Sequence, residues 1–249
     1  MARRGKAKTQ PPVRAAFSKR ASVAGIVRPR DLGITRSQLA RLVARGQAER
    51  VARGLYRLPG SDPTTHHTVA LVAKRVPHGI VCLVSALSIH EIGTQIPHQV
   101  WLAVAQKARK PELGALPIRI LRFSPDGLKR GIERRLIEGV PVAVTNPART
   151  VVDCFRYRHK VGLDVALEAL AEALRTRKVT VASLDEMASA CRARTVLRPY
   201  LEAMAWRRSE SVTEAMNRVA ELVDTRSDPG VAGAARRILE DLERELNLG

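Results

Sequence analysis

The side chains best suited to chemistry are concentrated in one short basic segment near the N-terminus. Between residues 35 and 45, hydroxyl, amide and guanidinium groups recur at positions that would share a helical face. At about 100° per residue, Ser37, Arg41 and Ala44 lie on one side of such a helix. The opposite side carries the apolar residues Leu39, Leu42 and Val43. Small, amide and guanidinium side chains on an exposed helix are suited to reading base edges and contacting phosphates.

The residues around this face predict the elements that would position it. Gly33 supplies the backbone freedom for a tight turn between two helices. The hydroxyl of Thr35 is placed to cap the second helix, and Gly46 is placed to end it. Residues 47–51 and 55–58 then predict a β-hairpin. This order is that of a winged helix-turn-helix, which lays its second helix in the major groove of DNA.

An ordinary helical hairpin with a solvated basic face is the alternative interpretation. The turn glycine, the cap, the closing glycine and the hairpin agree on the winged module, so we predict a DNA interface there. The expected base contacts come from Ser37, Gln38 and Arg41. The expected phosphate contacts come from Arg36, Arg45, Arg53 and Arg57. Thr35 completes the predicted DNA-binding set, Arg53 would lie at the wing tip, and Arg36 would point closest to the buried flank.

The net charge favours a polyanionic partner. The chain carries 43 lysine and arginine residues against 24 acidic ones, a formal net charge of +19. Residues 1–57 hold fifteen of the basic residues and only two acids, so +13 of this charge lies on or beside the proposed module. Such a field attracts nucleic acid and makes binding depend strongly on salt. We therefore predict double-stranded DNA as the partner.

Two other polyanions fit the rest of the composition less well. A membrane surface would also attract a basic chain, but no long apolar run or lipidation motif occurs. RNA stays an alternative, although aromatic residues make up only 3% of the chain and leave few platforms for stacked bases.

The bulk properties are typical of a globular protein inside the cell. With 249 residues, of which 45% are hydrophobic, the chain is long enough for one large or two ordinary domains with a core. Residues 1–10 are basic and polar, without the apolar stretch of a secretion signal, and we expect a flexible arm there. Cys82, Cys154 and Cys191 lie far apart, without pairing or metal-binding spacing. We expect reduced, buried thiols and a cytoplasmic location.

The remaining chain predicts mixed α/β structure followed by helices. Helices are expected at 15–24, at 64–76 after the start signal Asp62–Pro63, at 85–92, and from Asn146–Pro147 onward. Strands are expected at 80–83, 99–105, 118–123, 132–137 and 140–144. The predicted class is α+β, in four parts: a flexible basic arm (1–14), a winged helix-turn-helix (15–60), a mixed α/β domain (61–204) and a C-terminal helical extension (205–249).

Helix signals continue toward the C-terminus. Ser183 with Glu186, and Ser211 with Glu214, have the spacing of capping boxes, and Asp228–Pro229 would start the last helix. Residues 205–249 hold seven arginines against nine acids, unlike the basic front of the chain. We expect two helices packed as a hairpin there, with a docking or dimerising element as the alternative.

The sequence predicts neither a metal nor a cofactor, and no enzyme. The six histidines, at 66, 67, 78, 90, 98 and 159, lack the helical spacing of a zinc pair with a third ligand. No phosphate-cradling glycine loop or nucleophile elbow occurs. Ser85 and Ser88 lie near His90, but adjacency in sequence is no catalytic geometry, and we expect a helix cap and a helix surface there.

A metal-dependent nuclease with a DNA-binding module is the main alternative. In the restriction-endonuclease core, carboxylates on neighbouring strands hold Mg²⁺ beside a lysine. The nearest counterpart here is the strand end Ala105-Gln106-Lys107, which has alanine where the metal ligand is required. Glu91 could serve only as a lone carboxylate, and one carboxylate is not a metal site.

Three stretches, in this order along the chain, carry a family resemblance. Val51–Gly60, which ends the winged module, is similar to the signature RvxRGvYrlpg. Val84–Gly93 is similar to a helix of the form SAaxxhgl, and Val140–Asp153 is close to ipvtxpaRTlvD. Together they resemble the AbiEi antitoxins of type IV toxin–antitoxin systems, over about residues 15–204.

The resemblance implies a two-domain protein that represses its own operon. It would bind promoter DNA, expected to hold inverted repeats, and counteract a nucleotidyltransferase-like toxin without forming a stable complex with it. A plain winged-helix regulator without a toxin partner is a further alternative, which the sequence does not separate from an antitoxin.

One ion pair within the third stretch is predicted by spacing. Arg149 and Asp153 lie four residues apart on a predicted helix, which permits a pair worth at most a few tenths of a kcal/mol if exposed. We expect this pair to anchor the helix against strand 140–144, and a direct role in antitoxicity is the alternative.

Overall fold

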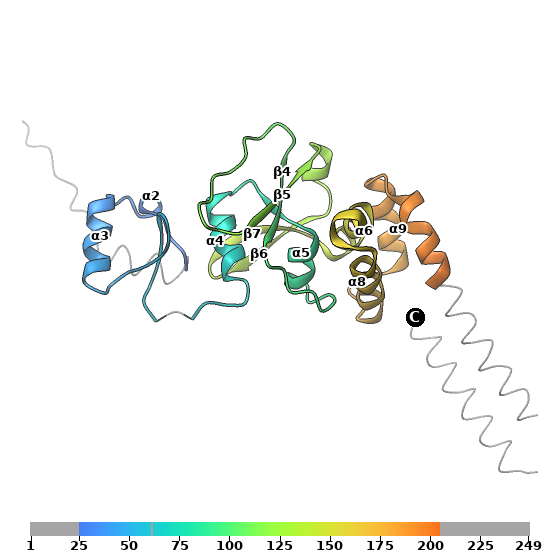
Figure 1. Cartoon of the computed structure of the whole chain (residues 1–249), viewed down its shortest axis with the longest axis horizontal. Coiled ribbons are helices and arrows are strands. Elements are labelled where there is room, and N and C mark those ends of the chain that lie inside the picture. Colours follow the sequence, from blue (N-terminus) through green and yellow to red (C-terminus); the bar gives the residue numbers. More distant parts are fainter. Residues whose placement is uncertain (1–24, 61, 205–249) are drawn as a thin grey trace, which may run out of the picture. The chain divides into compact units, whose positions relative to one another are not determined.

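The computed structural model describes residues 25–60 and 62–204, and the fold is α+β as predicted (Figure 1). The described chain begins with α2 (Pro29–Leu32) and α3 (Arg36–Ala44). The antiparallel strands β1 (Glu49–Ala52) and β2 (Leu55–Arg57) follow. Helix, turn, helix and hairpin thus appear in the predicted order, and we call residues 25–60 the winged module. The helix expected at 15–24 lies outside the described residues.

A five-stranded mixed sheet follows the winged module. Its spatial order is β5 (Ile118–Phe123), β4 (Val100–Ala105), β3 (Ile80–Val81), β7 (Val140–Thr145) and β6 (Ile132–Ile137). β4 pairs with β5 in parallel, and so does β3 with β7, while the other two pairs are antiparallel. Because parallel neighbours need a crossover, the chain between β4 and β5 must return along the sheet. It does so as the irregular loop 106–117.

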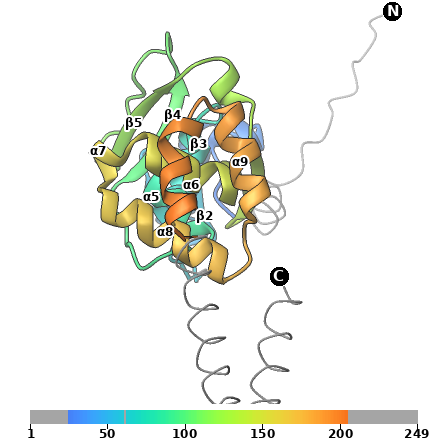
Figure 2. The same ribbon diagram turned by 90° about the vertical axis from the view of Figure 1, so that its right-hand side faces the viewer.

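Helices lie on both sides of this sheet. They are α4 (His67–Arg75), α5 (Leu83–Ile89), α6 (Pro147–Arg156), α7 (Arg158–Val161), α8 (Leu163–Arg175) and α9 (Val181–Ala190), with the short 3-10 helix η1 (Asp126–Leu128). Figure 1 shows α4 on one side of the sheet and α5 and α6 on the other. Figure 2 shows α6 between α8 and α9, both of which it contacts.

Two apolar clusters include buried residues of the winged module. The smaller cluster lies inside the winged module and consists of the buried residues Val27, Leu39, Leu42 and Ala48. The larger cluster joins Ile26 and Leu55 of that module to residues 69–73 of α4 and to β4 and β7. The winged module therefore shares a core with the sheet rather than hanging from a linker.

The chain divides into two compact units, residues 1–193 and 194–249. The winged module and the sheet belong to the first unit, and residues 194–204 of the second are helical. None of the helices in the described ranges has both the length and the apolar character needed to cross a membrane. The domain boundaries expected after residues 14, 60 and 204 stay predictions.

The helix expected at 64–76 begins later than the sequence indicates. α4 starts at His67, four residues after Pro63. Both the backbone N–H and the hydroxyl of Thr64 donate to Oε1 of Glu138, at 2.7 and 2.9 Å. Residue Thr64 is thus held by the distant β6–β7 turn outside the helix. The helix start predicted at Asp62–Pro63 was wrong by about one turn.

The boundary between β3 and α5 is also shifted. Residues 80–83 were expected as a strand, but β3 ends at Val81 and Leu83 begins α5. Cys82 still donates its N–H to the carbonyl of Trp101 on β4, at 3.0 Å. Leu83 then adopts a φ of +48°, which turns the chain out of the sheet. The helix ends at Ile89 rather than Ile92, because Glu91 adopts a φ of +54° and the N–H of Ile92 donates back to the carbonyl of Leu87 at 3.0 Å.

A capping box begins α9, but it is formed by other residues than the sequence predicts. α9 is capped by Thr180 with Ser183, whose side chains accept from each other's backbone N–H at 3.1 and 3.0 Å. The predicted box of Ser183 with Glu186 was therefore wrong by one helical turn. The expected cap Asn146 is confirmed, since its Oδ1 accepts from the N–H of Arg149 at 2.8 Å. The box at Ser211 and the helix start at 228 lie outside the described residues.

Candidate nucleic-acid interface

The turn between α2 and α3 is built as the sequence predicts. Gly33 has a φ of +66°, the left-handed conformation in which a side chain would be strained. Thr35 then caps α3, its hydroxyl accepting from the N–H of Gln38 at 3.2 Å. In return, Oε1 of Gln38 accepts from the N–H of Thr35 at 2.8 Å. This capping box uses the carbonyl oxygen of Gln38, so only its NH₂ group is left to donate to a base.

α3 presents the two faces that its spacing predicts. Leu39 and Leu42 are buried at 0% and 5% exposure, with Val43 half-buried beside them. The exposed residues of the helix and its two caps are Thr35, Arg36, Ser37, Ala40, Arg41, Ala44 and Arg45, whereas Gln38 is half-buried. Ser37 lies with its hydroxyl 2.9 Å from that of Thr35. Most of the predicted contact residues therefore lie on solvent.

The wing is a short, anchored hairpin. Arg53 and Gly54 form its two-residue turn, shorter than the expected one, and the pairing register shifts between Arg50 and Ala52. Arg53 is exposed at the tip, where its backbone carbonyl accepts a hydrogen bond from the guanidinium of Arg75 on α4. On its other edge, Tyr56 exchanges two backbone hydrogen bonds with Val27, at 2.8 and 3.0 Å. The tip is thus held by the chain on both sides.

Arg57 differs from the other predicted phosphate contacts because it already has an acidic partner. It lies directly across from Glu49 in the hairpin, with Nε 2.9 Å and Nη2 3.2 Å from the two carboxylate oxygens. This hydrogen bonding holds the pKa of Glu49 below its ordinary value. A phosphate at Arg57 would have to share or displace this carboxylate.

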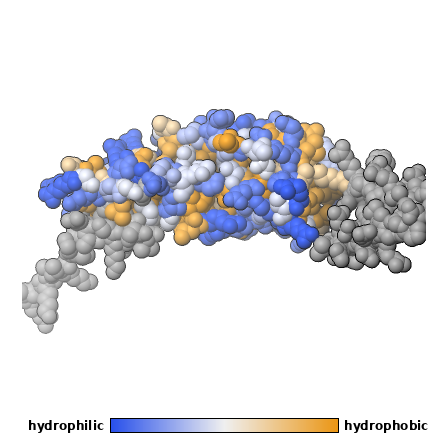
Figure 3. Space-filling model, turned by 90° about the horizontal axis from the view of Figure 1, so that it is seen from below, coloured by the Kyte–Doolittle hydropathy of each residue, from blue (hydrophilic) through white to orange (hydrophobic). Residues whose placement is uncertain are grey.

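Two exposed arginines of the winged module were missed by the sequence reasoning. Arg50 lies exposed on β1, and Arg30 lies exposed on α2. Arg50 could have been found from its place three residues before the wing-tip Arg53. In Figure 3, hydrophilic side chains are exposed at the left of the view among hydrophobic ones. Among residues 25–60, the exposed charged side chains are arginines apart from Glu49.

An ion cluster fastens α2 to α4. Asp31 lies 3.1 Å from the guanidinium of Arg28 and 3.0 Å from Nζ of Lys74, and Arg28 also donates to the carbonyl of Lys74 at 3.1 Å. Burial raises the pKa of Asp31, but the hydrogen bonds from Arg28 and Lys74 outweigh burial and leave the pKa below its ordinary value. Because Lys74 is far away in sequence, no local pattern indicates this contact.

The carboxylate of Glu138 binds the chain segment that follows the wing. Besides Thr64, Glu138 contacts Nδ1 of His67 through its other carboxylate oxygen at 2.7 Å. Gly25, at the start of the winged module, lies so close that a Cβ there would overlap the carbonyl oxygen of Glu138. The turn between β6 and β7 therefore contacts the winged module, the linker and α4 together.

Ser85 and His90 have structural partners. Ser85 is not the expected helix cap: it is buried inside α5, donates to the carbonyl of Gln99 at 3.3 Å and accepts from the N–H of Trp101 at 3.0 Å. It thereby ties α5 to the start of β4. Nε2 of His90 lies 2.6 Å from the carbonyl oxygen of Thr145, and burial lowers the pKa of His90.

The strand end considered for a nuclease site is where the sequence places it. β4 ends at Ala105, followed by Gln106 and Lys107. Within residues 25–60 and 62–204, no three or more His, Cys, Asp and Glu side chains come together in a way that could hold a metal ion. The three cysteines are unpaired and buried, as expected.

The Arg149–Asp153 pair forms, but not on the surface. Nε of Arg149 lies 2.7 Å from Oδ2 of Asp153, and the two side chains are only 1% and 0% exposed. Arg149 also donates to the carbonyl of Arg130 at 3.1 Å. Gly131 makes room for it, since a Cβ there would lie 2.8 Å from Cβ of Arg149. The expected scale of a few tenths of a kcal/mol, given for an exposed pair, does not apply to this buried one.

Comparison with known proteins bears mainly on the winged module. Residues 15–59 match the family described as "Transcriptional regulator, AbiEi antitoxin". No curated protein matches the chain in sequence. Among solved structures, the chain is similar to the crystal structure of the RV2827C protein from Mycobacterium tuberculosis, with 14% identity, a TM-score of 0.49 and 72% of each chain covered.

Proposed function

We propose that this chain is a DNA-binding transcriptional repressor that acts as the antitoxin of a type IV toxin–antitoxin operon. It binds its own promoter through the winged module and counteracts a nucleotidyltransferase-like toxin. The observation that carries the DNA-binding half is the exposed cationic face of α3 beside an exposed wing arginine. The family match over residues 15–59 supports the role of regulator and antitoxin.

Within this proposal, the residues on the winged module have separate tasks. Ser37 and Arg41 face the bases from the outer side of α3, and the NH₂ group of the half-buried Gln38 reaches them from its flank. Arg36, Arg45 and Arg53 contact phosphates on either side, and the exposed Arg50 extends this contact along the wing. Arg57 contributes less, because Glu49 occupies its guanidinium.

The antitoxic activity is assigned to the sheet and its helices. No winged-module residue is needed for it in this scheme, so repression and toxin rescue can be separated. The structure favours separating them by substitution rather than by deletion. Removing residues 1–61 would strip Ile26 and Leu55 from the larger apolar cluster and expose α4.

The test uses the full chain with both Arg36 and Arg41 changed to Ala. We expect loss of promoter repression in a reporter assay and unchanged rescue of cells that express the neighbouring nucleotidyltransferase. The Arg134→Ala, Arg158→Ala double variant removes the same charge from exposed sites outside the winged module and should repress normally. Loss of rescue by the folded Arg36, Arg41 variant would contradict the division of labour.

The alternatives are separated by two further results. A regulator without a toxin partner would repress its promoter and rescue no cells from the neighbouring gene product. A nuclease would cleave DNA or RNA when Mg²⁺ or Mn²⁺ is added to the purified chain, and we expect both nucleic acids to stay intact.

A further inference from the structure

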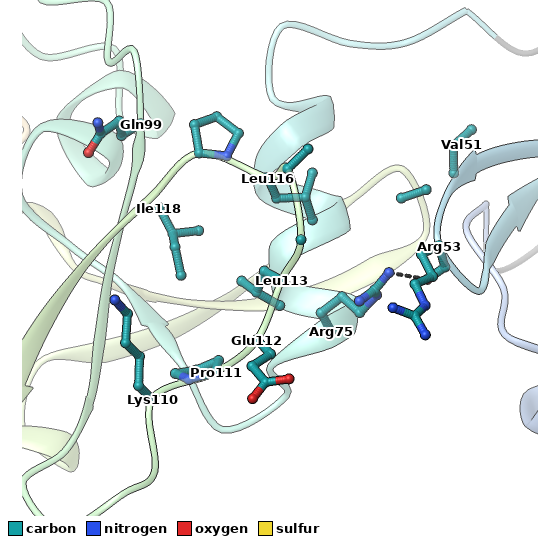
Figure 4. Close-up of a pocket in the computed structure, with 14 residues that line it drawn as sticks. Val51, Arg53, Arg75, Gln99, Lys110, Pro111, Glu112, Leu113, Leu116 and Ile118 are labelled. Carbon is teal, nitrogen blue, oxygen red and sulfur yellow. Dashed lines mark hydrogen bonds between the residues drawn. The ribbon is translucent and has the colours of Figure 1, made fainter.

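A groove opens between the wing and the 106–117 loop (Figure 4). One wall is residues 51–53 of the wing, the other is residues 110–118, and Arg75 of α4 lies between them. The space measures about 1210 Å³, somewhat more than typical small-molecule sites of about 300–1,000 Å³. The groove therefore has room for a small ligand beside ordered water.

The loop wall is held in place by the core. Leu113 is buried at 7% exposure, and Leu116 packs against the same apolar cluster. At the base of the loop, Arg122 donates to the carbonyl of Ala105 at 3.0 Å and also to that of Ala108. Although the loop lacks regular structure, both its ends and its middle are anchored. The groove is thus formed before any ligand binds, which lowers the entropy cost of binding.

The lining combines apolar surface with positive charge. Val51, Leu116 and Ile118 supply aliphatic side chains, and Lys110, Arg53 and Arg75 supply three cations around them. Among the described lining residues, Glu112 is the acid, and its carboxylate already lies 3.6 Å from the guanidinium of Arg109. Figure 4 shows Lys110 beside Ile118, opposite Val51 and Arg53. Aliphatic walls with unbalanced cations are complementary to a molecule with an apolar body and an anionic head.

We propose that this groove binds an amphipathic organic anion, of the class of medium-chain carboxylates. The alkyl body lies against Leu116 and Ile118, and the carboxylate is held by Arg53 and Arg75, which lie together on the wing side of the groove in Figure 4. A phosphate backbone alone would use the cations but leave the aliphatic lining against water, so the groove fits the small anion better.

Binding there would change the affinity for DNA, a step that rests on the proposed function. The ligand draws Arg53 toward its own anionic head, and Arg53 is the residue assigned to a DNA phosphate at the wing tip. Ligand and DNA then compete for one cation, so each weakens binding of the other by the same factor. The groove would make the repressor responsive to a small anion.

The binding test uses the full chain with two probes. 8-Anilinonaphthalene-1-sulfonate has an apolar body and one negative charge, and its fluorescence reports occupancy. We expect binding of one equivalent, displaced by octanoate but at least tenfold less effectively by octan-1-ol, which lacks the charge. Arg75→Glu and Leu116→Asn should each raise the octanoate Kd at least tenfold.

Matched controls keep this test specific. Lys129→Glu makes the same charge change at an exposed site outside the groove lining, and Leu136→Asn alters a leucine that is 75% exposed on β6. Both should bind octanoate like the parent chain. The proposal is overturned if Arg75→Glu leaves the Kd within twofold of the parent value, or if octan-1-ol competes as well as octanoate.

The DNA arm separates this proposal from the proposed function. Saturating octanoate should lower affinity for promoter DNA at least threefold in the parent chain and not in Arg75→Glu. If the chain binds octanoate but no DNA, the proposed function fails while the groove assignment stands. If Arg75→Glu weakens DNA binding without affecting octanoate, the groove holds DNA backbone instead and the ligand proposal is wrong.

Discussion

At the scale of single residues, Arg149 shows how burial changes the worth of a contact. Its guanidinium pairs with Asp153, donates to a backbone carbonyl and lies with its central carbon 5.2 Å from the ring centroid of Phe123. Its Nη2 has no hydrogen-bond partner among the described residues. A buried charge that loses its partner is left without solvation, so breaking such a pair costs about 3–5 kcal/mol. The same pair on the surface would contribute about 0–1 kcal/mol.

Arg149→Met should therefore destabilise the chain strongly, by about 3–5 kcal/mol, because Asp153 would remain buried with only Arg156 beside it. Urea unfolding at pH 7 measures the difference. Arg175→Met is the control, since Arg175 pairs with Glu172 at 2.7 Å but is 73% exposed, and it should cost at most about 0.5 kcal/mol. Equal effects of the two substitutions would contradict the role of burial.

Two exposed arginines of the winged module should affect DNA binding differently. Arg41→Ala should cost about 1–3 kcal/mol on the cognate site and relax the preference for it, because Arg41 lies on the reading face. Arg53→Ala should weaken all sequences about equally. Fluorescence anisotropy with promoter and scrambled DNA measures both ratios. An unchanged ratio for Arg41→Ala would mean that α3 is not the reading helix.

At the scale of elements, the turn between β6 and β7 decides how closely the winged module approaches the sheet. Gly25 and Gly33 both have positive φ, at +58° and +66°, so alanine is strained at either position. They differ in their surroundings: a Cβ at Gly33 meets nothing within 4 Å, whereas one at Gly25 overlaps the carbonyl of Glu138. Close packing thus adds to backbone conformation only at Gly25.

Gly25→Ala should therefore destabilise the chain more than Gly33→Ala. The left-handed conformation costs alanine about 1–2 kcal/mol at either site, and Gly25→Ala must in addition move backbone. Thermal unfolding of the two variants gives the comparison. If Gly25→Ala is no worse than Gly33→Ala, the winged module does not lie against this turn.

The carboxylate of the same turn gives a pH dependence. Burial raises the pKa of Glu138, but hydrogen bonds from His67 and Thr64 outweigh burial and lower the pKa below its ordinary value. Since the folded pKa is depressed, the stabilisation is complete above the ordinary pKa of about 4.3 and is lost as pH falls through the folded value. Glu138→Gln should cost about 1 kcal/mol at pH 7 and progressively less below about pH 4.

The free energy of unfolding of Glu138→Gln and of the parent chain is measured from pH 3 to pH 7. The difference between the two should shrink as the pH falls. Glu112→Gln is the control, because the Glu112 side chain is 88% exposed and its ion-pair partner Arg109 is 92% exposed. A constant difference between Glu138→Gln and the parent chain over this range would mean that the carboxylate does not hold the linker.

At the scale of the whole molecule, charge distribution sets the conditions under which DNA binds. Residues 1–57 carry +13 of the net +19, and the described exposed arginines of the winged module lie along α3 and the wing. Promoter affinity should fall by about 10³–10⁵ between about 50 and 200 mM salt if 6–10 phosphates are contacted. Binding isotherms at four salt concentrations measure the slope. A flat response would exclude an electrostatic interface.

The sequence by itself determined the local structure of the winged module. The turn at Gly33, the cap at Thr35 and the apolar spacing of α3 each depend only on residues a few positions apart in the chain. Asn146–Pro147 likewise located the start of α6. The strands β5 and β6 lie at the residues where the sequence predicts strands.

Only the tertiary structure decided which of these elements touch. Thr64 was assigned to a helix because nothing nearby shows that Glu138 takes its donors. The spacing of Arg149 and Asp153 predicts that the two side chains pair, but it does not predict that the pair is buried. The ion pair between Asp31 and Lys74 links segments that are far apart in the chain. The groove beside the wing is likewise lined by distant segments. Such contacts depend on how the sheet orders its strands, and that order is fixed by packing rather than by any local pattern.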